Sequence, residues 1–147
     1  DNPANPAIHY ATSGPDIWRD TDGRVDFFLA GVGNGGSVSG AGPYVNERNR
    51  ELRRIAVEPD DTPVHYGGAA GPHLIEGIGA GFVPGIYDED VVDEVIRVTN
   101  DDAIAATRRL AKTEGMLAGI SSGANLYAAR QVAARSEAQG QRIVTFI

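Results

Sequence analysis

The sequence predicts an α/β fold in which a parallel sheet is covered by helices on both faces, giving three layers. Short apolar runs rich in β-branched residues alternate with longer segments of helical character along the 147 residues. Strands that alternate with helices favour βαβ units, whose crossover helices cover a parallel sheet. Glycine-rich turns also stand between apolar runs and the helical segments after them, as expected where a strand leads into a helix.

Two helices and two strands are expected in the first half of the chain. Apolar runs and the glycines and prolines between them give the bounds: a helix within residues 6–18 that ends near Arg19, a strand at 25–30, a helix at about 37–49 and a strand at 54–58. Residues 60–90 hold seven glycines and three prolines with little periodicity. So long an irregular segment in a compact domain is usually functional.

Three strands and two helices are expected in the second half. In chain order they are a strand at 94–98, a helix from about 100 to 114, a short strand at 116–120, a helix that ends near Gly140 and a final strand at 142–147. Thr99 and Asn100 are N-cap candidates for the first of these helices. Gly115 is expected just beyond its end, because glycine readily adopts the left-handed conformation found there.

Charge and composition argue against several classes of function. Thirteen basic residues against twenty acidic ones give a net charge of −7, which disfavours a nucleic-acid or anionic-membrane surface. Cysteine is absent and the three histidines lie far apart in sequence, so a disulfide framework is impossible and a structural metal site is not expected. No apolar stretch approaches the ~20 residues that span a bilayer. We therefore expect a cytoplasmic protein without a membrane segment.

Both ends of the sequence indicate a piece of a larger protein. The apolar run 142–147 comes last, although a buried strand is usually followed by a loop and another element. The sequence also begins in a proline-rich loop. We expect residues 1–147 to be one domain portion, truncated at both ends.

The segment 31–37, Gly-Val-Gly-Asn-Gly-Gly-Ser, stands between a predicted strand and a predicted helix. Its glycines allow backbone N–H groups to turn inward, and together with the helix N-terminus they favour a phosphate-binding site. The same segment matches the G-x-G-x-x-G pattern of dinucleotide-binding domains, with Glu58 at the end of the next strand as the acid. A ligand-free turn and a solvated Glu58 are the simpler alternatives.

The segment 119–123, Gly-Ile-Ser-Ser-Gly, has three interpretations. It matches the nucleophile elbow of α/β-hydrolases, but no histidine follows His73 to complete the triad in that order. It also suits a helix cap with Ser122 as the N-cap residue. In the third interpretation Ser121 directs its hydroxyl at a ring nitrogen of a cofactor.

The segment 71–84 carries three glycines at alternate positions, at residues 77, 79 and 81. Such a backbone can approach a ligand closely, and its place in the long irregular segment favours a lid or a wall of an active site. A loop with mobile joints is the simpler alternative.

Together these segments resemble the cysteine synthase (O-acetylserine sulfhydrylase) family. The matching segments occur in the family's order and spacing, from Asn2 to the end of the chain: 2–6, 33–37, 57–59, 71–84 and 119–123. The resemblance implies a fold-type II enzyme that depends on pyridoxal 5′-phosphate and makes L-cysteine from O-acetylserine and sulfide. It implies that this chain is the C-terminal half, part of the large domain, of a homodimeric enzyme.

The resemblance also implies roles for individual residues. The cofactor phosphate would be held by Gly33, Asn34, Gly35, Gly36 and Ser37. Ser121 would face the pyridine nitrogen, and the substrate side would be lined by Gly77, Ile78 and Gly79. A neutral serine opposite that nitrogen suits β-elimination better than transamination.

The sequence departs from the family's pattern in ways that keep alternatives open. The family's Schiff-base lysine falls outside this chain, whose only lysine, Lys112, is expected to be a surface charge. No catalytic residue is therefore assigned here, and this polypeptide alone is expected to be inactive. Asn34 replaces a threonine, Tyr66 replaces a serine, and Leu74 stands where a basic residue is common.

Those departures allow a cystathionine or cyanoalanine synthase-like enzyme. From other classes, a dinucleotide-binding domain and a non-catalytic scaffold stay open. The scaffold would bind serine acetyltransferase, whose tail enters the pocket in this family. His73 lies in a loop that the family uses for that contact.

Overall fold

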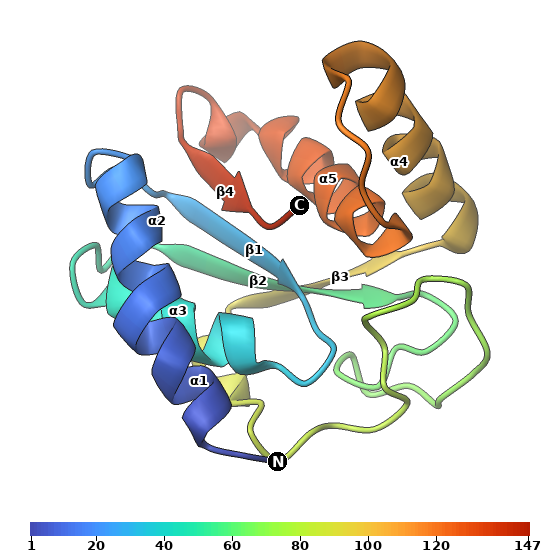
Figure 1. Ribbon diagram of the computed structural model, residues 1–147, viewed down its shortest axis with the longest axis horizontal. Coiled ribbons are helices and arrows are strands. Elements are labelled where there is room, and N and C mark those ends of the chain that lie inside the picture. The colour runs from blue at the N-terminus through green and yellow to red at the C-terminus, as the bar shows by residue number, and fades with distance from the viewer.

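In the computed structural model, which describes residues 1–147, a four-stranded parallel sheet lies between two groups of helices (Figure 1). The strands are β1 (Phe27–Gly31), β2 (Arg53–Pro59), β3 (Glu94–Val98) and β4 (Ile143–Thr145). The sheet order is β3-β2-β1-β4, and each neighbouring pair is parallel. The α/β class predicted from the sequence is confirmed.

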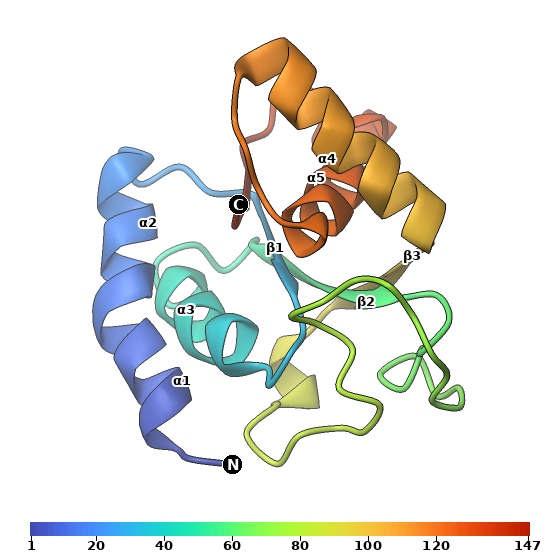
Figure 2. The ribbon, with the colours of Figure 1, turned by 45° about the vertical axis from the view of Figure 1, so that its right-hand side comes forward.

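Helices cover both faces of the sheet, as Figure 2 shows from a second direction. Those on one face are α1 (Ala4–Ile8), α2 (Gly14–Asp20) and α3 (Gly36–Asn46), with a π-helical turn at His9–Ser13 joining the first two. Those on the other face are α4 (Asn100–Glu114) and α5 (Ile120–Ala133). Two short 3₁₀ turns, Glu89–Val91 and Ser136–Ala138, complete the regular structure.

The side chains of β1 explain why the sheet has a core on each face. Successive strand residues point to opposite faces, so Phe27 and Leu29 join the apolar cluster beneath α4 and α5, whereas Phe28 and Ala30 join the cluster beneath α1 to α3. All four residues are buried. A strand buried on both faces reads as a continuous apolar run, which is the pattern of this segment.

The capping signals of α4 were read correctly from the sequence. The Thr99 side chain accepts a hydrogen bond from the Asp102 N–H at 3.2 Å, as an N-cap residue does. Gly115 follows the helix in the left-handed conformation, with φ of +70°. The prediction of a helix that ends near Arg19 also agrees with α2.

Three predictions about the second half were wrong. Residues 116–119 form no strand: Leu117 is 92% exposed and pairs with no neighbour, and an apolar run becomes a strand only where a partner satisfies its backbone. The last helix ends at Ala133, short of Gly140, and a 3₁₀ turn takes up part of the remainder. Gly119 occupies the N-cap position of α5, and Ser122 lies inside the helix, 8% exposed.

Residues 60–90 are largely irregular, as predicted, and leave the carboxyl end of β2. Their first part is closed at its base by Thr62, which is 1% exposed. The Thr62 hydroxyl donates to the Gly71 carbonyl and accepts the Gly71 N–H at 2.7 Å. The segment between Thr62 and Gly71 is therefore a loop with a fixed base.

Candidate functional site

The sheet order places a crevice at the carboxyl end of β1. The chain adds β2 and β3 on one side of β1 and then returns to place β4 on the other side. In open parallel sheets, ligands bind outside the carboxyl ends of the strands where the order reverses in this way. The glycine-rich turn predicted to bind phosphate leaves β1 at this point.

That turn presents a helix N-terminus whose N-cap residue has no side chain to cover it. Gly35 is the N-cap residue of the 11-residue helix α3, with φ of +83°, a conformation that favours glycine. Asn34 Oδ1 accepts the Gly36 N–H at 3.0 Å, which fixes the turn. The positive end of the helix dipole and the remaining first-turn N–H groups favour an anion at this position.

The loop 77–79 packs directly on the glycine-rich turn. The Gly79 N–H donates to the Val32 carbonyl at 2.9 Å. A Cβ at Gly33 would stand 2.5 Å from the Gly77 carbonyl oxygen, closer than any side chain tolerates. Glycine is therefore required at position 33 for the two segments to meet.

A cavity of about 510 Å³ opens between these two segments. The turn contributes Gly33 and Asn34, and the loop contributes Gly77 and Ile78. The rest of the lining is Asp1, Ala80, Phe82 and Pro84. The segment 71–84 is thus a wall of the cavity, as its glycines predicted.

The third predicted segment comes to the same place. Ser121 is the second residue of α5 and is half-buried. Its Oγ lies 3.7 Å from the position that a Cβ on Gly77 would occupy. The structure therefore brings together the turn, the loop and the start of α5, three segments separated by at least 40 residues in the sequence.

The donors around the turn fit a phosphate group. Ser37 Oγ lies in the first turn of α3, 3.4 Å from His9 Nε2, and His9 is in turn within 2.8 Å of Ser13 Oγ. Asn5 Oδ1, an acceptor, lies where a Cβ on Gly36 would stand, so glycine is required at position 36. Amide, hydroxyl and helix-terminal donors are the groups that bind phosphate at such turns, and no Lys or Arg lines the cavity.

The environment of Glu58 contradicts both interpretations made from the sequence, the acid of a dinucleotide-binding site and a solvated surface acid. It is completely buried at the end of β2, and its two carboxylate oxygens accept the N–H groups of His65 and Tyr66 at 2.9 and 3.0 Å. It is neither a solvated acid nor free to bind a ribose. Burial raises the pKa of the Glu58 carboxyl above its usual range, although the two N–H donors act against that rise.

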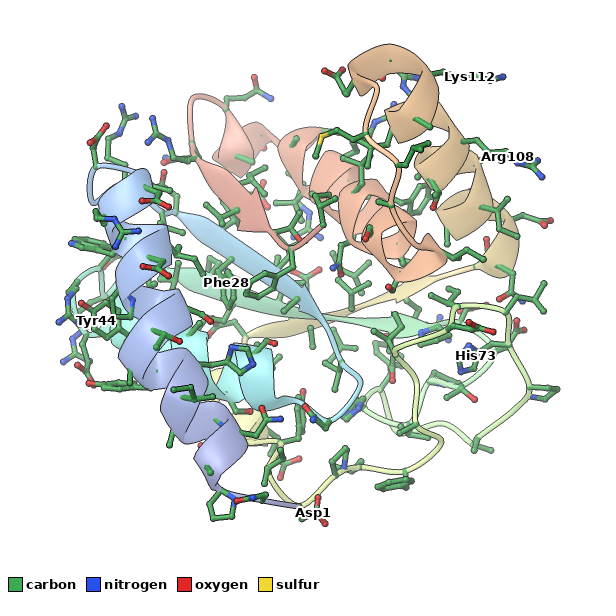
Figure 3. The ribbon with its side chains drawn as sticks, in the orientation of Figure 1. Asp1, Phe28, Tyr44, His73, Arg108 and Lys112 are labelled. Atoms are coloured by element: carbon green, nitrogen blue, oxygen red, sulfur yellow. The ribbon has the colours of Figure 1, made fainter.

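His73 is engaged inside its own loop. The ring accepts the Ile75 N–H on Nδ1 at 3.2 Å, so its Nε2–H donates to the Gly79 carbonyl at 2.9 Å. The ring thereby holds the glycine-rich wall of the cavity in shape. Figure 3 shows His73 in this loop, and shows Arg108 and Lys112 pointing outward from α4, so Lys112 is a surface charge as predicted.

Asn125 is a residue of this region that the sequence did not identify. It lies one helical turn after Ser121 on α5 and is 6% exposed. Its Nδ2 donates to the Phe146 carbonyl at 3.0 Å, and its Oδ1 is buried beside Gly31 without a partner. The available signal was a lone amide on an otherwise apolar helix face.

The structure has neither a metal-binding cluster nor a membrane-spanning helix. No three His, Asp or Glu side chains gather closely enough to hold a metal ion. No helix is long and apolar enough to cross a membrane.

Comparison with known proteins gives consistent matches over the whole chain. Residues 1–147 match the family described as "Pyridoxal-phosphate dependent enzyme". Cysteine synthase 3 of Caenorhabditis elegans is 50% identical over 146 residues, which are 99% of this chain and 43% of that protein. This chain spans about half the length of the curated relatives it matches.

Solved structures agree with the sequence matches. The cysteine synthase of Entamoeba histolytica superposes with a TM-score of 0.95 at 42% identity, covering 97% of this chain and 42% of that one. The O-acetylserine-dependent cystathionine β-synthase of Helicobacter pylori gives a TM-score of 0.89 at 38% identity, covering 99% and 47%.

Proposed function

The chain belongs to the family of pyridoxal-phosphate-dependent enzymes, and from that premise we propose that it is the cofactor-holding half of an enzyme that makes L-cysteine from O-acetylserine and sulfide. The relatives named cysteine synthase support the reaction. Residues 1–147 would be the C-terminal portion of the enzyme's large domain. The lysine that bonds to the cofactor, and hence the complete activity, would come from the rest of the polypeptide.

One observation carries this proposal: the turn after β1 and the loop 77–79 line one cavity, and Ser121 at the start of α5 lies beside Gly77 of that loop. We assign the phosphate to the turn residues Gly33, Asn34, Gly35, Gly36 and Ser37. Ser121 would meet the pyridine nitrogen, and the substrate would lie along Gly77, Ile78 and Gly79.

When bound, the cofactor supplies an electron sink that permits loss of acetate from the β-carbon and addition of a nucleophile there. The chain's own residues then have three tasks. The turn binds the phosphate through backbone and side-chain donors. The Ser121 hydroxyl, being neutral, orients the ring without placing a carboxylate against its nitrogen. Ile78, Phe82 and Pro84 form an apolar wall that limits water around the reacting carbon.

A second substrate pair is favoured by one of the solved relatives. The Helicobacter pylori structure is named for O-acetylserine-dependent cystathionine synthesis, which replaces sulfide by a larger thiol. We keep this as the alternative acceptor for the same site.

The resemblance to cysteine synthases also leads us to propose how the complete enzyme assembles and which protein it binds. The complete enzyme would be a homodimer in the cytoplasm, and serine acetyltransferase would be a partner whose tail enters the cavity. His73 would act in that contact by holding the loop 73–79 in shape, since its ring is occupied by the Ile75 and Gly79 backbone.

The test uses the full-length polypeptide that contains residues 1–147, purified with pyridoxal 5′-phosphate. We expect a yellow protein whose absorbance changes when O-acetylserine is added, and which then forms cysteine with sulfide. Cystathionine formation with homocysteine at a higher kcat/KM would favour the alternative acceptor. A protein that retains no cofactor would contradict the proposal. Binding of the acetyltransferase tail with no response to O-acetylserine would favour the non-catalytic scaffold.

A further inference from the structure

Behind the turn assigned to the phosphate lies an aromatic side chain that none of the three glycine-rich segments 31–37, 71–84 and 119–123 includes. Tyr87, near the end of the long irregular segment, packs directly beneath Gly35. A Cβ placed on Gly35 would stand 2.8 to 3.0 Å from Tyr87 Cβ, Cδ2 and Cα. Gly35 is also the residue with positive φ at which the turn reverses. The shape of the turn therefore depends on where Tyr87 is held.

Tyr87 is held on one side through α3. The Asp88 N–H donates to Ser39 Oγ at 2.9 Å, and Ser39 lies in the first turns of α3. The Tyr87 N–H donates to the Pro84 carbonyl at 3.0 Å, which places Tyr87 in a turn that follows the cavity wall. The bond to Ser39 fixes this segment relative to the helix whose N-terminus Tyr87 supports, and the bond to Pro84 fixes the local turn.

On the other side Tyr87 is held by His65. The two ring centroids are 4.3 Å apart, with planes inclined at 52°. Both ring nitrogens of His65 are buried without a hydrogen-bond partner, so this ring serves as a packing surface. The His65 N–H donates to Glu58, which is completely buried at the end of β2. A continuous series of contacts thus connects the sheet to Gly35: Glu58, His65, Tyr87.

We propose that Tyr87 is a positioning residue for the phosphate-binding turn, holding Gly35 so that the N–H groups at the start of α3 converge on the anion. This inference rests on the proposed function, since it concerns the phosphate of the same cofactor. The hydroxyl of Tyr87 has no part in it. The support comes from the ring and the β-carbon, both of which lie against Gly35 or His65.

The test compares two forms of vitamin B6 that differ only in the phosphate. Affinities for pyridoxal 5′-phosphate and for pyridoxal are measured by fluorescence titration of the complete polypeptide and its variants. In Tyr87→Ala we expect the phosphate form to bind about tenfold more weakly, the loss that follows when a charge-assisted hydrogen bond is misaligned. Pyridoxal should bind within about twofold of the original protein, because its contacts do not include the turn.

Tyr87→Phe keeps the ring and should restore both affinities. Tyr44→Ala is the matched control, since Tyr44 lies on α3 itself but packs against Tyr10 and Gly14, away from Gly35. That variant should bind both forms as the original protein does. If Tyr87→Ala accumulates poorly, His65→Ala removes the supporting ring instead, and the same selective loss of the phosphate form is expected.

Equal weakening of both forms, or no change in either, would overturn the assignment of Tyr87, as would a failure of Tyr87→Phe to restore binding. An original protein that binds neither form would instead refute the proposed cofactor site. The two failures are therefore distinguishable.

Discussion

Two glycine–serine turns lie near the loop 77–79, and they are built in opposite ways. At the start of α3, Gly33 and Gly35 are each in contact with another segment, the Gly77 carbonyl and Tyr87 respectively. At the start of α5, a Cβ on Gly119 would find only Ser121 Oγ, 3.9 Å away. Gly119 also has an extended conformation open to any residue, whereas Gly35 has a positive φ.

The difference indicates two kinds of recognition. The first turn is a backbone cradle in which neighbouring segments exclude side chains, so that N–H groups can reach a ligand. The second turn displays one side chain, that of Ser121, from the start of a helix. Glycines at the first turn are therefore required by their neighbours, whereas glycine at position 119 is required by nothing that it contacts.

The largest expected difference between the turns is in the effect of replacing a glycine by alanine, at position 33 in the first turn and at position 119 in the second. Gly33→Ala places a methyl group against the Gly77 carbonyl, a backbone atom that cannot move away alone. We expect the free energy of unfolding to fall by about 1–3 kcal/mol and cofactor binding to be lost with it. Urea denaturation and fluorescence titration measure the two effects.

Gly119→Ala is the control for that substitution. Its φ of −74° suits alanine, and the added methyl group meets open space, so a cost of about 1 kcal/mol or less is expected from the change of N-cap residue. A Gly119→Ala protein as damaged as Gly33→Ala would show that the contrast between the turns is not real.

A smaller difference is expected between the two serines. If Ser37 donates to phosphate, Ser37→Ala should weaken cofactor binding by about 1.5–3 kcal/mol, as for a hydrogen bond to a charged group. Ser121→Ala removes a bond to a neutral ring nitrogen and should cost about 0.5–1.5 kcal/mol. Dissociation constants for pyridoxal 5′-phosphate measure both, and the reverse order would exchange the roles assigned to the two residues.

The smallest expected effect is a pH dependence of the free energy of unfolding that arises at His65, whose ring supports the first turn through Tyr87. Burial lowers the pKa of His65 below its ordinary value of 6.5, so the unfolded chain binds this proton at a higher pH than the folded protein. Stability from the neutral ring is then fully present above about pH 6.5 and is lost as the pH falls toward the lower folded pKa. His65→Leu should remove that part of the acid-induced loss.

The measurement is the free energy of unfolding of both proteins, followed from about pH 8 to about pH 5. Glu58 acts in the opposite direction, because its raised pKa makes its contribution disappear as the pH rises, but it is present in both proteins. Parallel pH profiles for the original protein and His65→Leu would show that the ring does not titrate as described.

The sequence predicted the fold well because its strands are buried on both faces and read as apolar runs. The run 25–30 illustrates this, since β1 packs on both sides. The run 116–120 is also apolar but has no partner strand, and apolar character cannot reveal whether a partner exists. Pairing is a property of the folded chain.

The site was predicted in part for a similar reason. Glycine-rich segments are easy to recognise in a sequence. The turn, the loop and the start of α5 could therefore all be identified from the sequence, although their proximity could not. Tyr87 and Asn125 carry no motif, and their importance arises only from what they touch. Glu58 shows the converse: its position suggested a ligand-binding acid, whereas its oxygens are taken up by two backbone N–H groups.

The paired hydrogen bonds between Thr62 and Gly71 have a consequence for how this chain can vary. Because the base of the loop is closed by its own two bonds, and His65 and Tyr66 are held by Glu58, the four residues between Tyr66 and Gly71 can change in number without moving the sheet. Doubling the length of a flexible loop costs only about 0.6 kcal/mol in chain entropy. Insertions can therefore accumulate between Tyr66 and Gly71 while the contacts of His65 with Glu58 and Tyr87 stay constant.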